Sequence, residues 1–161
     1  MQVLEGTSKA GGLRFAVVVS RYNDFVTRPL LAGALATLAE AEVPEQDVTV
    51  VHVPGAFELP VAAQRLAATG RFAAVICLGC LIRGATPHFE YIAGAVAHAL
   101  ATASIGTGVP IAFGVLTTNA AEEALERAAS GPSNKGREAA AAAVEMATLL
   151  RALDPGAERL P

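Results

Sequence analysis

Four short apolar segments limit what this chain can fold into. They are rich in β-branched residues and lie at 14–20, 48–53, 73–82 and 110–118. Each is almost continuously apolar, whereas a strand with one solvated face alternates apolar and polar residues. Continuous apolar strands are typical of a parallel sheet that is covered on both faces. The sequence therefore predicts a buried parallel sheet of four strands.

Helical patterns fill the intervals between the predicted strands. They cover residues 28–42, 60–69, 88–104, 120–129 and 135–153. The resulting order is β-α-β-α-β-α-β-α-α. Such alternation predicts an α/β fold of three layers, in which right-handed crossovers place helices on both faces of the sheet.

Glycine and proline residues mark where two of these helices should begin or end. Pro60 suits a first helical turn, where its missing N–H would be unpaired anyway. Gly70 and Gly106 stand where helix ends belong, since glycine readily takes the left-handed conformation that ends a helix. Residues 1–12 lie outside the pattern, and we expect them to form either a short extra strand or an arm to a neighbouring subunit.

Length, composition and charge narrow the class of protein. We expect one domain over 1–161 with its core at about 13–153, because this length can bury a substantial core. No unbroken apolar run reaches the ~18 residues of a membrane span, and the first residues lack the apolar segment of a signal peptide. These features predict a cytoplasmic protein. The net charge of −3, without a basic cluster, argues against nucleic acid or a membrane as partner.

Cys77 and Cys80 form a C-x-x-C pattern, for which a redox pair and a zinc site are the alternatives to buried thiols. Their context is the core of a predicted strand, where residues three apart point to opposite faces. No second pair of Cys or His ligands stands at metal spacing. We therefore expect two buried thiols and no metal centre.

Polar and aromatic residues concentrate in the loops that follow the strands. In open parallel sheets, ligands bind beyond the carboxyl ends of the strands. The chain has eight aromatic residues, six Phe and two Tyr, and half of them lie in or just after these loops: Tyr22, Phe57, Phe89 and Tyr91. This concentration predicts a ligand site at the carboxyl edge of the sheet.

The loop at 83–87, Arg-Gly-Ala-Thr-Pro, leads from the third predicted strand to a helix that begins near His88. Unpaired backbone N–H groups and the positive end of a helix suit a phosphate or a carboxylate. A histidine beside them can transfer protons near neutral pH. From these residues alone, a solvated turn with a surface histidine remains the alternative.

Four other residues have two interpretations each. Tyr22 would stack on a planar heterocycle or plug the sheet edge. Glu58 would accept hydrogen bonds from hydroxyl groups or favour a helix dipole. Arg127 and Lys135 flank a loop between helices and are either anion ligands or ordinary solvated charges. The sequence has no dinucleotide-binding glycine pattern, Walker loop or nucleophile elbow, which argues against several common α/β enzymes.

Six segments resemble the lumazine synthase family in order and spacing. They are SRYND, VPGAFELP, LGCLIRGATPHFEYIA, FGVLTT, ALERA and NKGREAAAAAVEMA, and the resemblance covers about residues 1–153. It implies a flavodoxin-like sheet and a transferase of riboflavin biosynthesis that works without a cofactor. The implied reaction condenses 5-amino-6-(D-ribitylamino)uracil with 3,4-dihydroxy-2-butanone 4-phosphate. It yields 6,7-dimethyl-8-ribityllumazine and phosphate, the penultimate step of the pathway.

The resemblance also implies roles for individual residues. His88 matches the proton-transfer residue, and Lys135 and Glu138 match supporting positions. The phosphate site would comprise Ala85, Thr86 and Arg127. The ribitylaminouracil site would comprise Tyr22, Asn23, Ala56, Phe57, Glu58, Cys80, Leu81, Ile82 and Phe113.

The partners that the resemblance implies are the two substrates, phosphate and further copies of the chain. The family forms pentamers in which Phe113, Arg127 and Lys135 enter the neighbour's site, and some members assemble into icosahedral shells of sixty subunits. Riboflavin synthase is a further implied partner. Two other functions stay open: an archaeal-type riboflavin synthase of the same fold, and a non-catalytic shell protein that binds flavin or lumazine.

Overall fold

A parallel sheet forms the middle layer of the protein. The computed structural model describes residues 1–154, and within them the strands are β1 (Phe15–Ser20), β2 (Val48–Val53), β3 (Ala74–Ile82) and β4 (Ile111–Thr118). All neighbours pair in parallel in the order β2-β1-β3-β4. This order confirms the predicted flavodoxin-like sheet, with β2 and β4 at its edges.

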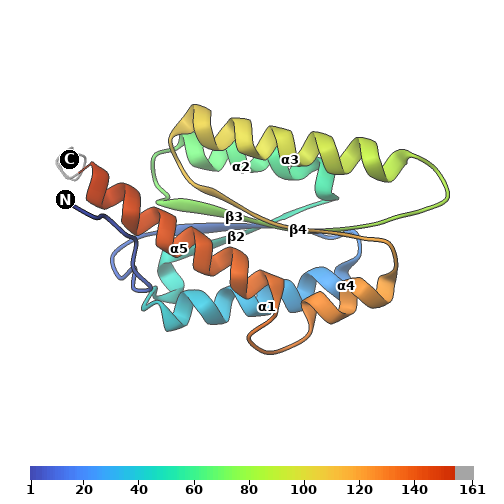
Figure 1. The fold of residues 1–161 in the computed structure, drawn as a ribbon, viewed down its shortest axis with the longest axis horizontal. Helices are drawn as coiled ribbons and strands as arrows, with labels where there is room; N and C mark the ends of the chain where they lie inside the picture. The colour runs from blue at the N-terminus through green and yellow to red at the C-terminus, as the bar shows by residue number, and fades with distance from the viewer. Residues whose placement is uncertain (155–161) are drawn as a thin grey trace.

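Helices cover both faces of the sheet (Figure 1). The elements α2 (Leu59–Ala68) and α3 (His88–Thr107) pack on one face. The elements α1 (Asp24–Glu40), α4 (Ala121–Ala128) and α5 (Lys135–Leu153) pack on the other. Short 3₁₀ turns precede β2 at Glu45–Asp47 and α2 at Ala56–Glu58. The predicted three-layer architecture is confirmed.

Two apolar cores lie on opposite sides of the sheet, because successive strand residues point to opposite faces. In β1, Phe15 and Val17 face α1 and α5, while Ala16 faces α2 and α3. Cys77 and Cys80 follow the same rule and belong to different cores. Burial raises the pKa of Cys77 to about 12 and the pKa of Cys80 to about 11. Both are buried, unpaired thiols, as predicted.

Two helix ends differ from the prediction. The first helix begins at Asp24, four residues before the predicted start, because Asn23 adopts a left-handed conformation with φ of 60° and turns the chain into the helix. The third helix continues through Gly106 and ends before Gly108, whose φ is 71°. Gly70, with φ of 70°, follows α2 as predicted. Of two nearby glycines after an apolar pattern, the sequence did not reveal which one ends the helix.

Residues 1–14 form no strand, so the extra N-terminal strand is not present in the described chain. The segment packs against its own helices instead. The Thr7 N–H donates to Thr148 Oγ1 of α5 at 2.8 Å, and the Ala10 N–H donates to the carbonyl of Ala41 at 2.9 Å. Gly6 passes so close to α5 that a Cβ there would lie 2.1 Å from the Glu145 carbonyl oxygen. An arm to a neighbouring subunit stays a prediction.

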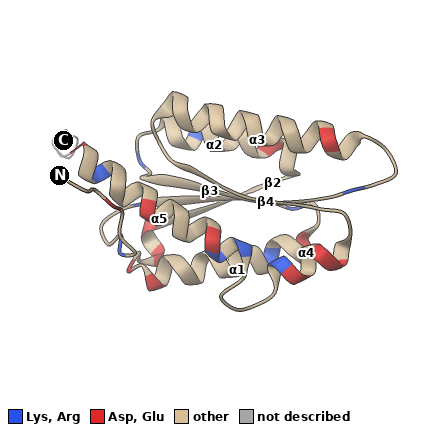
Figure 2. Cartoon of the chain, in the orientation of Figure 1, with Lys and Arg blue, Asp and Glu red and all other residues tan. Residues whose placement is uncertain are grey.

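Charged residues are distributed unevenly over the two helical layers (Figure 2). They are frequent on α1, α4 and α5, whereas α2 carries only Arg65 and α3 only Glu90. Despite this apolar character, no helix within residues 1–154 combines the length and hydropathy that crossing a bilayer requires. The face formed by α2 and α3 therefore contrasts with the charged face opposite.

Candidate active site

A hollow of about 610 Å³ opens at the carboxyl edge of the sheet, within the size range of small-molecule sites. Three loops and one helix end line it. The loops follow β1, β2 and β3, and the helix end is the first turn of α3. The edge that the sequence predicted as a ligand site is thus hollowed.

The loop after β1 contributes Tyr22 and Asn23. Tyr22 keeps 72% of its surface exposed, although its backbone N–H donates to the Pro54 carbonyl at 3.0 Å. The Asn23 side chain donates from Nδ2 to the Cys80 carbonyl at 3.0 Å. These two bonds fix the loop to its neighbours and leave the tyrosine ring uncovered at the hollow, available to stack on a planar group.

The loop after β2 brings an aromatic ring and a carboxylate to the same hollow. Ala56 is buried and supports the turn, while Phe57 is 62% exposed. Glu58 is half-buried, and its carboxylate forms no hydrogen bond or ion pair with residues 1–154. A Cβ at Gly55 would lie 3.1 Å from Glu58 Oε2, so the small residue leaves room for the carboxylate.

The end of β3 forms the floor of the hollow. Leu81 and Ile82 line it directly. The Cys80 side chain is buried in the core, so its contribution there is its backbone, and its carbonyl already accepts the bond from Asn23.

The loop after β3 supplies Gly84 and Thr86 to the hollow, with exposed Ala85 between them. His88 begins α3, is exposed and also lines the hollow. No side chain caps this helix N-terminus. The first N–H groups of a helix lack partners within the helix, so an anion could bind here beside the imidazole.

Four predicted site residues lie in a different hollow of the same chain. Phe113, Arg127, Lys135 and Glu138 line a depression of about 380 Å³ between β4, α4 and α5. Lys135 forms an ion pair with Glu138 at 2.8 Å, and Arg127 donates to the Glu123 carbonyl at 3.2 Å. Within one chain, these four residues therefore do not join Tyr22, Phe57 and His88.

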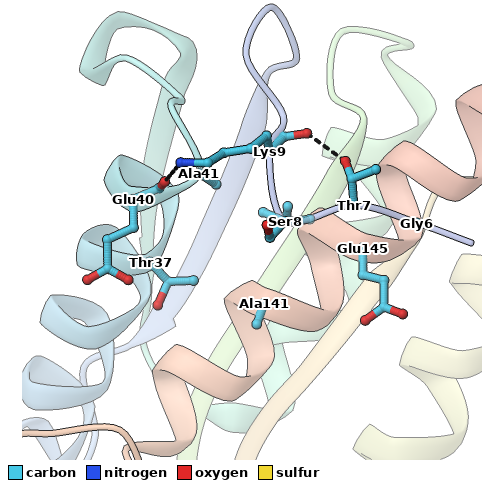
Figure 3. Close-up of a pocket in the computed structure, with 10 residues that line it drawn as sticks. Gly6, Thr7, Ser8, Lys9, Thr37, Glu40, Ala41, Ala141 and Glu145 are labelled. Atoms are coloured by element: carbon cyan, nitrogen blue, oxygen red, sulfur yellow. Dashed lines mark hydrogen bonds between the residues drawn. The ribbon is translucent and has the colours of Figure 1, made fainter.

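A third hollow, of about 520 Å³, lies between the N-terminal segment, α1 and α5 (Figure 3). Lys9 spans it by donating to the Glu40 carbonyl at 2.8 Å and pairing with Glu42 at 3.1 Å. The Thr37 hydroxyl is buried at its wall without a hydrogen-bond partner in the described chain. No predicted site residue and no aromatic side chain lines this hollow, so it does not match the predicted ligand.

In the part of the chain that the structure describes, no three His, Cys, Asp or Glu side chains are grouped closely enough to hold a metal ion. Cys77 and Cys80 belong to opposite cores and cannot share a ligand sphere.

Comparison with known proteins decides the family. The family model described as 6,7-dimethyl-8-ribityllumazine synthase matches residues 12–151. The chain belongs to this family. A relative from Syntrophus aciditrophicus (strain SB), named 6,7-dimethyl-8-ribityllumazine synthase, is 54% identical over 149 residues, which is 92% of this chain and 97% of the relative. The resemblance in the six segments is thereby confirmed.

Sequence reasoning missed Gly55 and Ile92 of the hollow in this lumazine synthase family member. It noted Gly84 and Phe89 only as parts of the loop and helix after the third strand, without a role of their own. Ile92 stands four residues after His88 on α3, and side chains at this spacing share one helix face, so the helical period could have found it. Gly55 matters for the space that it leaves, and a missing side chain gives little signal in a single sequence.

Proposed function

We propose that this chain condenses 5-amino-6-(D-ribitylamino)uracil with 3,4-dihydroxy-2-butanone 4-phosphate to 6,7-dimethyl-8-ribityllumazine. The observation that carries the proposal is that one hollow joins an uncovered aromatic ring, a carboxylate with no partner among residues 1–154 and a histidine at a helix N-terminus. Membership of the lumazine synthase family supports the same reaction. The enzyme is therefore a transferase of riboflavin biosynthesis.

The pyrimidine would bind across the mouth of the hollow. Tyr22 would stack on its ring, because an exposed aromatic face gains most from a planar partner. Its polar edge would meet the backbone of residues 80–82 at the end of β3. Asn23 would hold the end of β3 in place for this contact, through its hydrogen bond to the Cys80 carbonyl.

The ribityl chain would lie along the loop after β2. Glu58 would accept hydrogen bonds from its hydroxyl groups, since the carboxylate has no partner among the described residues. Ala56 lacks a polar side chain and would contribute only backbone groups, and Phe57 would shield the chain from water. Such an arrangement orients the substrate's amine toward the loop that carries His88.

The four-carbon phosphate would bind at Ala85 and Thr86, before the N-terminus of α3. The substrate's amine attacks the ketone and forms an imine with loss of water. Removal of a proton from the hydroxyl-bearing carbon then expels phosphate from the next carbon and leaves an enol, which tautomerises to a ketone. Attack of the second amine on this new carbonyl closes the ring with loss of another water. His88 would carry protons between these steps. Because the substrate brings its own nucleophile, Lys135 is not needed as a Schiff-base lysine.

The site would be completed by a neighbouring subunit in a homopentamer. Phe113, Arg127 and Lys135 would enter the neighbour's hollow, with Arg127 on the phosphate and Phe113 on the pyrimidine; Glu138 would orient Lys135. The separation of the two hollows in one chain supports this proposal, since a heterologous interface can join unlike surfaces in a closed ring. A sixty-subunit shell and a riboflavin synthase partner are further proposals, as is a cytoplasmic location.

A substrate assay tests the proposed reaction. The pure protein is mixed with both substrates while lumazine absorbance and released phosphate are followed. We expect equal amounts of both products. Riboflavin formed from lumazine alone would instead indicate a riboflavin synthase of the same fold. Tight binding of lumazine without turnover would indicate a non-catalytic shell protein.

A further inference from the structure

Arg83 is the first residue after β3, and it does not line the candidate site. Its backbone N–H donates to the Thr118 carbonyl at 2.8 Å, which extends the pairing of β3 with β4. Its Nε donates to Asn119 Oδ1 at 2.9 Å. The Asn119 N–H donates in turn to Glu123 of α4 at 3.1 Å. The base of the arginine side chain is thus anchored to the end of β4.

The far end of the same side chain reaches the first turn of α3. One terminal nitrogen of the guanidinium pairs with the Glu90 carboxylate. The guanidinium carbon also lies 4.6 Å from the centre of the Phe89 ring, within the range of a cation–π contact. Arg83 therefore links the loop after β4 to the two residues that directly follow His88.

The segment 84–87, between Arg83 and the start of α3, has few other restraints. Residues 84–87 are exposed, and their side chains form no hydrogen bond with the described chain. A Cβ at Gly84 would meet nothing within 4 Å. Pro87 precedes α3 without a side-chain cap. Holding such a segment in one conformation requires contacts at its ends, because each unrestrained residue otherwise samples several conformations.

We infer that Arg83 is a positioning residue that holds Thr86 and His88 in place before the four-carbon phosphate binds. The inference rests on the site proposed above. Arginine suits this task because its planar guanidinium donates in two directions and stacks on a ring at the same time, which a lysine ammonium cannot do. Exposed ion pairs contribute little to overall stability. Loss of the Arg83 side chain should therefore change the conformation of segment 84–87 and of His88, and leave the stability of the fold nearly unchanged.

Steady-state kinetics of Arg83→Ala test the inference. We expect kcat to fall about 10- to 100-fold, since a misplacement of about 1 Å can cost about a hundredfold. KM for the butanone phosphate should rise about tenfold, while KM for the ribitylaminouracil should change less than about twofold. The matched control is Arg14→Ala. Arg14 is an exposed arginine directly before β1, at the amino ends of the strands and so away from the site, and it pairs with Asp47 at 3.4 Å. Its removal should leave both KM values unchanged.

Two further variants separate positioning from general support. Arg83→Lys keeps a charge beside Glu90 without the planar fork, and its kcat should lie between those of the wild type and Arg83→Ala. Glu90→Gln keeps Arg83 and its contact with the Phe89 ring, and weakens only the ion pair with α3. If Arg83 and Glu90 act through one contact, the double variant Arg83→Ala with Glu90→Gln should lose no more activity than Arg83→Ala alone.

Two results would overturn the inference. One is equal KM changes for both substrates, together with a melting temperature well below that of Arg14→Ala. The other is Arg83→Ala kinetics that match Arg14→Ala. A failure of the proposed function looks different, because the wild type would then make no lumazine or His88→Ala would be fully active.

Discussion

At the scale of single residues, the candidate site depends on a few side chains that the loops after β1, β2 and β3 and the start of α3 bring to one hollow. Tyr22, Phe57, Glu58 and His88 line one hollow as expected for residues at the carboxyl edge of a parallel sheet. Arg83 stood in the same loop but was not nominated. Its importance depends on Glu90 and Asn119, seven and thirty-six residues away, and no local pattern predicts such a set of contacts.

His88→Ala tests the proton-transfer role. We expect kcat to fall by a factor of about ten to a thousand, as for the loss of one acid–base group, with ribitylaminouracil affinity nearly intact. Stopped-flow turnover and equilibrium binding measure the two quantities. His52→Ala is the control, because His52 is exposed on β2 and does not line the hollow. Full activity of His88→Ala would remove the imidazole from the mechanism.

Arg127→Ala tests whether Arg127 binds the phosphate group of the four-carbon substrate. Inorganic phosphate, used as an inhibitor, should bind about 1.5–3 kcal/mol more weakly, as expected for the loss of a charge-assisted hydrogen bond. Binding of the ribityl-pyrimidine should change little, and Arg127→Lys should recover part of the phosphate affinity. Calorimetry with both ligands gives the answer. Equal losses for the two ligands would mean that Arg127 supports the structure and not the anion.

At the scale of elements, the apolar runs predicted each strand to within one residue. The burial that the continuous apolar composition indicated holds for β1 and for most of β3, but is wrong for the edge strand β2, in which only Val53 is buried. Helix ends were harder. The start of α1 depends on the left-handed conformation of Asn23, which any of several nearby polar residues could adopt. The connection from α4 to α5 was predicted only as a loop between Arg127 and Lys135, yet it contains a buried anchor, Asn134.

Asn134 joins three elements through four hydrogen bonds. Its Oδ1 accepts from the N–H groups of Gly136 and Arg137 and so caps α5. Its Nδ2 donates to the carbonyls of Pro29 in α1 and Ala128 in α4, at 3.2 and 2.8 Å. Gly136 allows this approach, since a Cβ there would lie 2.0 Å from the Leu30 carbonyl oxygen.

Asn134→Ala should therefore lower the free energy of unfolding by about 2–4 kcal/mol, because it removes a helix cap together with the two hydrogen bonds to α1 and α4. Urea unfolding measures this change. Ser133→Ala is the matched control, because Ser133 is an exposed neighbour and its truncation should cost less than about 0.5 kcal/mol. A loss for Asn134→Ala as small as that of the control would mean that the four bonds contribute nothing net.

At the scale of the whole molecule, the predicted site residues of one chain line two separate hollows. The hollow with Tyr22 and His88 uses the loops after β1, β2 and β3, whereas Phe113 and Arg127 come from the edge strand β4 and from α4. The outer face of α3 also exposes Tyr91 and Ile105 and bears no charge after Glu90. Exposed apolar surface of this kind marks protein interfaces. Both observations support a ring in which unlike surfaces of adjacent subunits meet.

Mixed oligomers test whether the site is shared. At a limiting concentration of the butanone phosphate, we expect His88→Ala and Arg127→Ala each to have low activity alone. The two chains are unfolded together at equal amounts and refolded. In a shared site, His88 comes from one subunit and Arg127 from its neighbour, so random mixing should restore about a quarter of the sites. If each site lay within one chain, every site would lack one of the two residues and no activity would return. Native mass spectrometry must show that the rings are mixed, and co-refolding of each variant with itself gives the baseline. Activity at that baseline in confirmed hybrids, or a monomer by light scattering, would contradict the shared site.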